Sequence, residues 1–248
     1  QPKAQIAGRH VTGVEALVRW RHPTRGVLAP DLFIPLAEST GLLGPLTHWV
    51  LSRAIEDAAH WHRGGLPLSV AVNVSPRSLI EGDLPAAIVC LLAKCGLPSR
   101  LLEVEVTETA IMTDPAGSSN VLRQLRAIGI PISIDDFGSG YTSLGYLKTL
   151  PIDALKIDRS LISDLTADDK GLAVTQSIID LGHRLGLTVL AEGVETEETW
   201  RLLESLGCDE GQGYLLARPM PAEHIEGWIT SHQHSRESWD PTVQPTTL

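Results

Sequence analysis

Residues 132–147 of the chain read ISIDDFGSGYTSLGYL. The stretch begins as an apolar, β-branched run typical of a buried strand, and Asp135 and Asp136 stand where that strand should end. Gly138 and Gly140 follow, and glycine permits backbone angles that other residues avoid. Because successive strand side chains point to opposite faces, two neighbouring acids share one site only where the strand has begun to unwind. Adjacent carboxylates are costly to bury together, so the pattern favours a divalent cation, with an Asx turn as the alternative.

The composition is that of a chain with a sizeable core and an excess of acids. The 248 residues are 43% hydrophobic and carry a formal net charge of −10. This length suits one large α/β domain or two small ones. The negative charge argues against a protein that binds polymeric nucleic acid through its phosphates. A small phosphate ligand remains compatible with it, provided that metal ions supply positive charge.

The cysteines and the apolar runs bear on the cellular compartment of the protein. Three cysteines at irregular spacing are too few for a disulfide framework, which is typical of a reduced, intracellular protein. No apolar run approaches the roughly 20 residues that span a bilayer, and no signal peptide is visible. We therefore expect a cytoplasmic location and no membrane segment in these residues. Gln1 is not a natural start, so we expect a piece of a longer protein, which other regions could tether to a membrane.

Short buried strands alternate with helices along the chain. After two β segments within residues 1–20, strands are expected at 68–75, 101–108, 132–137, 152–158, 187–195 and 208–220. Helices are expected at 46–63, 84–94, 118–127, 144–150, 173–185, 197–206 and 222–230. This alternation without a linker indicates a (β/α) barrel over residues 1–230, followed by a polar, disordered tail at 231–248. A doubly wound open sheet is the alternative, but no G-x-G-x-x-G follows the first strand.

Polar side chains recur at the ends of the expected strands. They are Asn73, Glu105, Asp135, Asp158, Glu192 and Gln212, spaced by about one βα unit each. In a barrel the strand ends meet at one mouth, where residues serve chemistry. Carboxylate and amide oxygens suit Mg²⁺ or Mn²⁺ rather than zinc, and two such ions are the usual arrangement for displacement at phosphorus. Lys156 is placed to orient a water or neutralise developing charge, and Arg19 to hold a phosphate oxygen. Any single acid could instead be a helix cap or half of a salt bridge.

Seven motifs in order resemble the EAL domain family, bacterial phosphodiesterases that linearise the second messenger cyclic di-GMP to 5′-pGpG. They are Glu15-Ala16-Leu17 with Val18-Arg19-Trp20, Asn73-Val74-Ser75, Glu105-Val106-Thr107-Glu108, Asp135-Asp136-Phe137-Gly138, Leu155-Lys156-Ile157-Asp158, Ala191-Glu192-Gly193-Val194-Glu195 and Gln212-Gly213-Tyr214. The resemblance runs from Gln1 to about Trp228. It implies a TIM-like (β/α)8 barrel whose first strand is antiparallel to the rest.

The resemblance also implies roles for individual residues. The metal ligands would be Glu15, Asn73, Glu105, Asp135 and Glu192, with Asp136 and Asp158 serving a second ion. The catalytic residues would be Lys156, Glu192, Glu15 and Gln212, of which Lys156 and Gln212 would position waters. Substrate contacts would come from Gln1, Leu17, Arg19, Asn73, Tyr214, Arg218 and Pro219. Glu108 and Glu195 would brace the loop after Asp136, which includes Phe137, Gly138 and Ser139.

The same resemblance implies two Mg²⁺ or Mn²⁺ ions, a homodimer formed through loop 137–144 and adjacent helices, and a sensor or GGDEF domain elsewhere in the protein. Thr142 and Leu216-Ala217 depart from the common family pattern, but none of them is a metal ligand. The alternatives are a receptor that binds cyclic di-GMP without cutting it, and a structural domain that binds no nucleotide. Such receptors typically lack one of the acids or the lysine, whereas this set is complete, which favours the enzyme.

Overall fold

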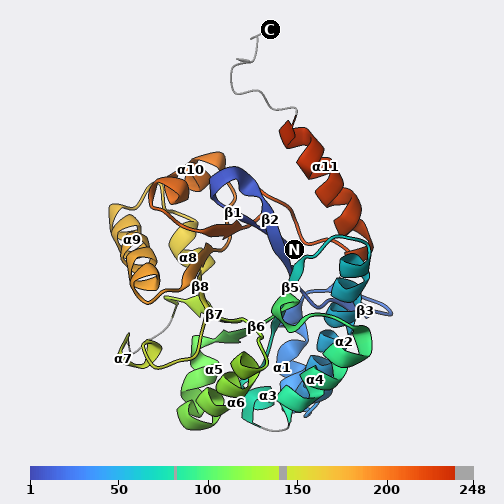
Figure 1. Cartoon of the computed structure of the whole chain (residues 1–248). Helices are drawn as coiled ribbons and strands as arrows, with labels where there is room; N and C mark the ends of the chain where they lie inside the picture. The colour runs from blue at the N-terminus through green and yellow to red at the C-terminus, as the bar shows by residue number, and fades with distance from the viewer. Residues whose placement is uncertain (81–82, 140–143, 238–248) are drawn as a thin grey trace.

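The computed structural model describes residues 1–80, 83–139 and 144–237 of the chain. Strands close into a barrel in the order β1-β10-β9-β8-β7-β6-β5-β2. Their bounds are β1 Pro2–Gln5, β2 Val11–Ala16, β5 Ser69–Asn73, β6 Leu102–Thr107, β7 Ile132–Phe137, β8 Ala154–Ile157, β9 Thr188–Ala191 and β10 Glu210–Gln212. Figure 1 shows these strands as a ring with the helices outside it. The expected barrel is confirmed.

The direction of the first strand differs from that of the others. β1 pairs antiparallel with both of its neighbours, β2 and β10. The other neighbouring strands of the ring pair in parallel. The reversed first strand that the family resemblance implied is therefore confirmed.

The helices fall between the strands, with small additions near the N-terminus and at the C-terminal end. The longer ones are α2 Leu43–Arg63, α4 Leu84–Cys95, α6 Pro115–Ala127, α9 Asp169–Arg184, α10 Glu197–Ser205 and α11 Ile225–Glu237. The short ones are α1 Ile34–Ser39, α3 Pro76–Ile80, α5 Glu108–Thr113, α7 Leu144–Leu147 and α8 Arg159–Ile162. Turns of 3₁₀ helix lie at η1 Ala7–Arg9, η2 Pro30–Leu32, η3 Ser99–Leu101 and η4 Ala222–His224. A separate hairpin pairs β3 Trp20–His22 with β4 Gly26–Leu28.

Most boundaries differ from the expected ones by a few residues, and three differences bear on the site or on the C-terminal end. α11 continues to Glu237, beyond the boundary at 230, and residues 238–248 lie outside the described ranges. β9 ends at Ala191, so Glu192 follows the strand, and Gly193 then adopts a φ of 67° that ends the extended run. β10 covers three residues only, and the chain after Gln212 turns away. None of the helices in the described ranges is long and apolar enough to cross a membrane.

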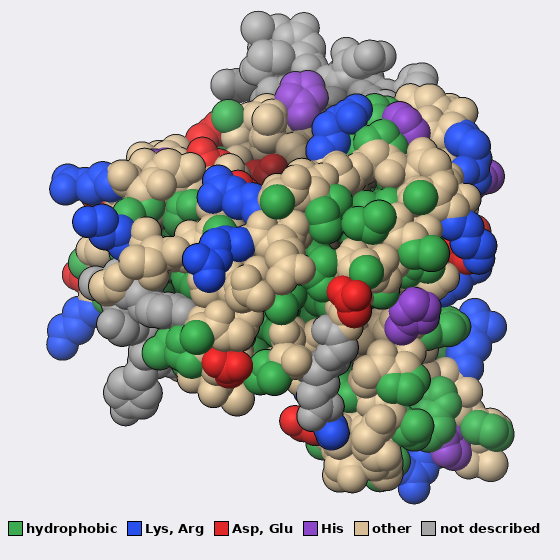
Figure 2. Space-filling model, turned by 60° about the horizontal axis from the view of Figure 1, so that its bottom comes forward, with side chains coloured by type: hydrophobic (Ala, Val, Ile, Leu, Met, Phe, Trp, Pro, Cys, Tyr) green, Lys and Arg blue, Asp and Glu red, His purple; other side chains and the backbone are tan. Residues whose placement is uncertain are grey.

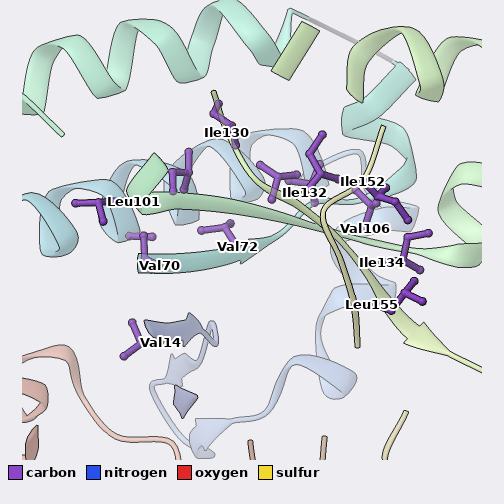
Figure 3. Packing of buried hydrophobic residues seen from close by; sticks show 14 of the residues in the cluster. Val14, Val70, Val72, Leu101, Val106, Ile130, Ile132, Ile134, Ile152 and Leu155 are labelled. Atoms are coloured by element: carbon purple, nitrogen blue, oxygen red, sulfur yellow. The ribbon is translucent and has the colours of Figure 1, made fainter. Parts of the chain in front are cut away.

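The strands alternate apolar and polar side chains, which divides the protein into two buried layers. Val70, Val72, Val106 and Ile134 are buried in the hydrophobic layer between strands and helices, part of which Figure 3 shows. The intervening positions on the same strands are polar or small, and Glu105 among them is fully buried. Because these positions face the other way, the inside of the barrel is lined with charged groups.

Gly213 lies directly after Gln212, where the chain passes against the backbone of Val194. A Cβ at position 213 would lie 2.1 Å from the Val194 carbonyl oxygen and 2.3 Å from its nitrogen. Gly213→Ala is therefore expected to lower the free energy of unfolding by about 3 kcal/mol, because the two backbones must move apart. Chemical denaturation measures this. Gly227→Ala in α11 is the matched control, since nothing lies within 4 Å of that position, and equal losses from both variants would contradict the prediction.

Candidate functional site

Lys156 of β8 lies at the centre of a cluster of carboxylates inside the mouth of the barrel. Its side chain is 1% exposed. The Nζ atom lies 2.7 Å from Glu192 Oε1, and 2.9 Å from both Glu105 Oε2 and Asp135 Oδ1. Glu15 Oε2 is 3.7 Å away. One buried ammonium therefore faces four acids from four strands or strand ends, an arrangement with a large excess of negative charge.

Two amides hold the acid that comes from β2. Asn73 Nδ2 donates to Glu15 Oε1 at 2.7 Å and to Glu105 Oε2 at 3.2 Å. Gln212 Nε2 donates to Glu15 Oε2 at 2.7 Å and to Gln1 Oε1 at 3.3 Å. Both oxygens of Glu15 are thus fixed from two sides, so this carboxylate has a defined orientation.

β7 unwinds at the two adjacent aspartates, as the sequence predicted. Asp136 has a φ of 54°, and the pairing of β7 with β8 shifts register between Ile134 and Phe137. The Asp136 N–H donates to Asp135 Oδ1 at 3.1 Å. This left-handed residue lets two consecutive side chains approach one site, because a regular strand would point them apart.

Asp158 caps a helix, which is the alternative that the sequence left open for any single acid. Its Oδ1 accepts a hydrogen bond from Ser160 N at 2.9 Å, at the start of α8. Its charge also contributes to the raised pKa of Asp136. One acid can therefore both cap a helix and contribute charge to the mouth of the barrel.

The crowding of acids changes their proton affinities in opposite directions. Burial, aided by Asp135 and Asp158, raises the pKa of Asp136 to about 6. Burial also raises the pKa of Glu192 to about 7, although Lys156 opposes the shift. Burial raises the pKa of Glu105 as well, against the opposing charge of Lys156. The pKa of Glu15 is lowered despite its burial, because Lys156 and Gln212 stabilise the charged form. Burial thus raises the proton affinity of Asp136, Glu105 and Glu192, and a bound cation would lower it.

The metal-free domain is expected to lose stability as the pH rises from 4.5 to 6. A carboxyl group with a raised pKa binds its proton more tightly in the folded state, so its stabilising contribution is lost as the pH rises through this range. For Glu192, with a pKa raised from 4.5 to about 7, the loss is about 2 kcal/mol over this range. Thermal unfolding in EDTA across this pH range measures it. Glu192→Gln should flatten the fall, and a midpoint that rises with pH in the unaltered domain would contradict the prediction.

The donor set fits divalent cations. Carboxylate oxygens lie within 4.8 Å of one another in two groups, Glu15 with Glu105 and Asp135, and Asp135 with Asp136 and Glu192. Glu105 Oε1 is buried without a hydrogen-bond partner among the described residues, as an atom reserved for a ligand would be. In the described ranges no histidine or cysteine belongs to either group, and Figure 2 shows histidines scattered over one face. Hard oxygen donors of this kind suit Mg²⁺ or Mn²⁺.

A cavity of about 490 Å³ lies along β2, between α2 and the segment that begins at Pro219, and of the clustered acids Glu15 alone lines it. Its lining includes Gln1, Glu15, Leu17, Arg19 and Pro219, which brings together four of the expected substrate contacts with one of the acids. The other two contacts from the last loop, Tyr214 and Arg218, lie outside this lining and stack on each other. The Arg218 guanidinium carbon is 4.3 Å from the Tyr214 ring centroid.

Glu108 and Glu195, which are expected to brace the loop after Asp136, lie in different surroundings. Glu108 is buried at the start of α5, whereas Glu195 is exposed after β9. Within the described residues, neither forms a hydrogen bond with Phe137, Gly138 or Ser139, and residues 140–143 of the same loop lie outside the description. Ser139 Oγ instead donates to the Asp136 carbonyl oxygen at 2.8 Å. The bracing role therefore stays a prediction.

One buried pair escaped the sequence reasoning. Lys3 of β1 and Glu103 of β6 form an ion pair inside the barrel. The available signal was position: Glu103 lies two residues before Glu105 and so faces the same side of β6. Nothing in the order of residues pairs it with Lys3, because the two are 100 positions apart.

Comparison with known proteins identifies the family of this fold. The EAL domain family model matches residues 1–219. The chain belongs to the EAL domain family. The solved structure "PaMucR Phosphodiesterase, c-di-GMP complex" matches this EAL domain with a TM-score of 0.87 and 44% identity, covering 91% of this chain and 92% of that one.

Curated relatives of this EAL domain are longer proteins. Cyclic di-GMP phosphodiesterase PA2567 of Pseudomonas aeruginosa is 43% identical over 229 residues, which cover 92% of this chain and 39% of the relative. The bifunctional diguanylate cyclase/cyclic di-GMP phosphodiesterase MucR of the same organism is 44% identical over 226 residues, covering 91% and 33%. The chain therefore spans between a third and two fifths of these two relatives.

Proposed function

We propose that this EAL domain is a metal-dependent phosphodiesterase that hydrolyses cyclic di-GMP to linear 5′-pGpG. The observation that carries the proposal is the complete carboxylate cluster around Lys156. A cavity that shares Glu15 with this cluster reaches Arg19 and Pro219. Two relatives named as cyclic di-GMP phosphodiesterases support the reaction and the substrate. A structure named as a c-di-GMP complex supports the substrate.

Two divalent cations, Mg²⁺ or Mn²⁺, are part of this proposal. Glu15, Asn73, Glu105, Asp135 and Glu192 would hold one, and Asp136 and Asp158 would contribute to the second. Bound cations of this kind lower the pKa of water and stabilise negative charge on phosphate oxygens. The Asn73 amide nitrogen donates to the acids in this structure. A flip of the amide group would present its oxygen to a cation instead.

The protein groups have separable tasks in the proposed reaction. Lys156 holds three acids within 2.9 Å and supplies a fixed positive charge beside the phosphate. Gln212 orients Glu15 and, through its free Oε1, accepts a hydrogen bond from a water. Arg19 pairs with a phosphate oxygen, while Leu17 and Pro219 contact a guanine base. Tyr214 and Arg218 lie on the same loop as Pro219 and would contact the other guanine base.

The deciding experiment is incubation of the domain with cyclic di-GMP and Mg²⁺ or Mn²⁺, with and without EDTA, followed by chromatography. Appearance of 5′-pGpG only when metal is available is the expected result. Tight binding of cyclic di-GMP without product in either metal would identify a receptor and reject the enzyme. Absence of both binding and turnover would reject the nucleotide site itself.

The setting of the domain is also proposed. We propose a cytoplasmic location. We also propose that the domain is part of a longer protein with a sensor or GGDEF domain, because MucR combines diguanylate cyclase and phosphodiesterase in one chain. A homodimer through loop 137–144 belongs to the same proposal, although residues 140–143 lie outside the described ranges. Sedimentation with and without cyclic di-GMP tests the dimer, and a monomer at all concentrations would reject it.

A further inference from the structure

A second lysine is buried inside the barrel in addition to Lys156. Lys3 is 4% exposed and pairs with Glu103, which is 9% exposed. Their strands, β1 and β6, are not neighbours in the ring, so the pair crosses the interior. Gly13 leaves the space for it: a Cβ at that position would lie 2.0 Å from Ser69 Oγ and 3.2 Å from Lys3 Cε. Glycine at position 13 of β2 therefore leaves room for the aliphatic part of the Lys3 side chain.

The two lysines form two levels along the inside of the barrel. Glu103 and Glu105 lie two residues apart on β6 and point to the same side, so one acid belongs to each level. Glu105 Oε2 lies 2.9 Å from Lys156 Nζ, while Glu103 pairs with Lys3. Among the described residues, Lys3 and Lys156 are the buried basic side chains. Lys156 is therefore the other cation available to Glu103.

We propose that Lys3 is a positioning residue that neutralises Glu103 and thereby leaves Lys156 to the carboxylates at the mouth. A buried carboxylate without a partner is strongly unfavourable, so it draws in whichever cation can reach it. Without Lys3, Lys156 descends toward Glu103 and its contacts with Glu192 and Asp135 are lost. The effect on turnover rests on the proposed phosphodiesterase function, whereas the position of Lys156 does not.

Lys3→Met and the double variant Lys3→Met/Glu103→Gln test this. In crystals of the metal-free single variant, Lys156 Nζ is expected within hydrogen-bond distance of Glu103. Cyclic di-GMP turnover is expected to fall at least about tenfold, since small displacements of a catalytic group are costly. The double variant removes the acid that attracts Lys156, so it should restore both the position and most of the turnover. A purely structural role would leave the double variant as impaired as the single one.

Two results would overturn the proposal: Lys156 unmoved in Lys3→Met, or no recovery in the double variant. If Lys3→Met does not fold, Lys3→Gln replaces it, because its amide can hydrogen-bond to Glu103 without supplying charge. Gly227→Ala, which changes neither level, should leave Lys156 in place. Should the unaltered domain show no hydrolysis, the phosphodiesterase proposal fails, while the position of Lys156 in the two variants still decides the role of Lys3.

Discussion

Lys156→Met is expected to reduce cyclic di-GMP turnover by at least about a thousandfold. The change removes a positive charge next to the phosphate and the ammonium that forms ion pairs with four acids. The four carboxylates raise the pKa of Lys156 well above its usual value, against the opposing effect of burial, so the ammonium is charged at neutral pH. Methionine fills similar space without charge. The metal-free variant should also lose about 3–5 kcal/mol of stability, as expected when a buried charge cluster loses its partner.

Thermal unfolding with and without Mn²⁺ separates these two effects. Divalent cation should recover much of the lost stability, since it returns positive charge to the acids, but it should not restore turnover. Lys94→Met on the exposed face of α4 is the matched control and should change neither quantity. If Lys156→Met retains turnover within tenfold of the unaltered domain, Lys156 has no part in the reaction.

Asp135→Asn is expected to abolish metal-dependent turnover, with a loss of at least about a thousandfold. Asp135 is the acid shared by the two carboxylate groups, so its replacement weakens both proposed cation sites together. Glu15→Ala should also abolish turnover, although Glu15 belongs to only one of the groups. Calorimetric titration with Mn²⁺ measures the binding, and chromatography of 5′-pGpG measures the turnover.

The fold is expected to survive the change at Asp135, because the charge removed was in excess. Asp180→Asn in α9, an exposed acid that accepts a hydrogen bond from Gln176, is the matched control and should leave Mn²⁺ binding and turnover unchanged. Undiminished turnover in either Asp135→Asn or Glu15→Ala would reject the two-cation assignment. A variant that binds Mn²⁺ normally but turns over slowly would reject the shared position of Asp135 between two ions.

The sequence alone predicts those features of the site that depend on a single strand. Alternation on β6 and β7 puts Glu105 and Asp135 on the inner side, and the glycines after Asp136 indicate where β7 unwinds. The reversal of β1 was different, because four alternating residues look the same in either direction. It came from family resemblance rather than from the residues themselves.

Contacts between distant strands could not be predicted from the residues alone. The Lys3–Glu103 pair exists only because the closed ring brings opposite walls together, and no local pattern encodes that distance. The end of β9 before Glu192 was missed for a related reason. An apolar run with two acids suggests a longer strand, while the observed end depends on Gly193 lying against Arg159 of α8. A Cβ on Gly193 would lie 2.7 Å from the Arg159 Cβ.

The position of β1 between β2 and β10 makes completion of the site a late event in synthesis. The ring closes only when the last strand of the barrel docks beside the first. Glu15 leaves the ribosome early and Gln212 leaves it late, yet a 2.7 Å hydrogen bond joins them in the finished site. Domains fold largely as units once enough chain has emerged. A polypeptide that stops before residue 210 therefore carries every acid of the site, but it lacks β10 and Gln212 and cannot close the ring.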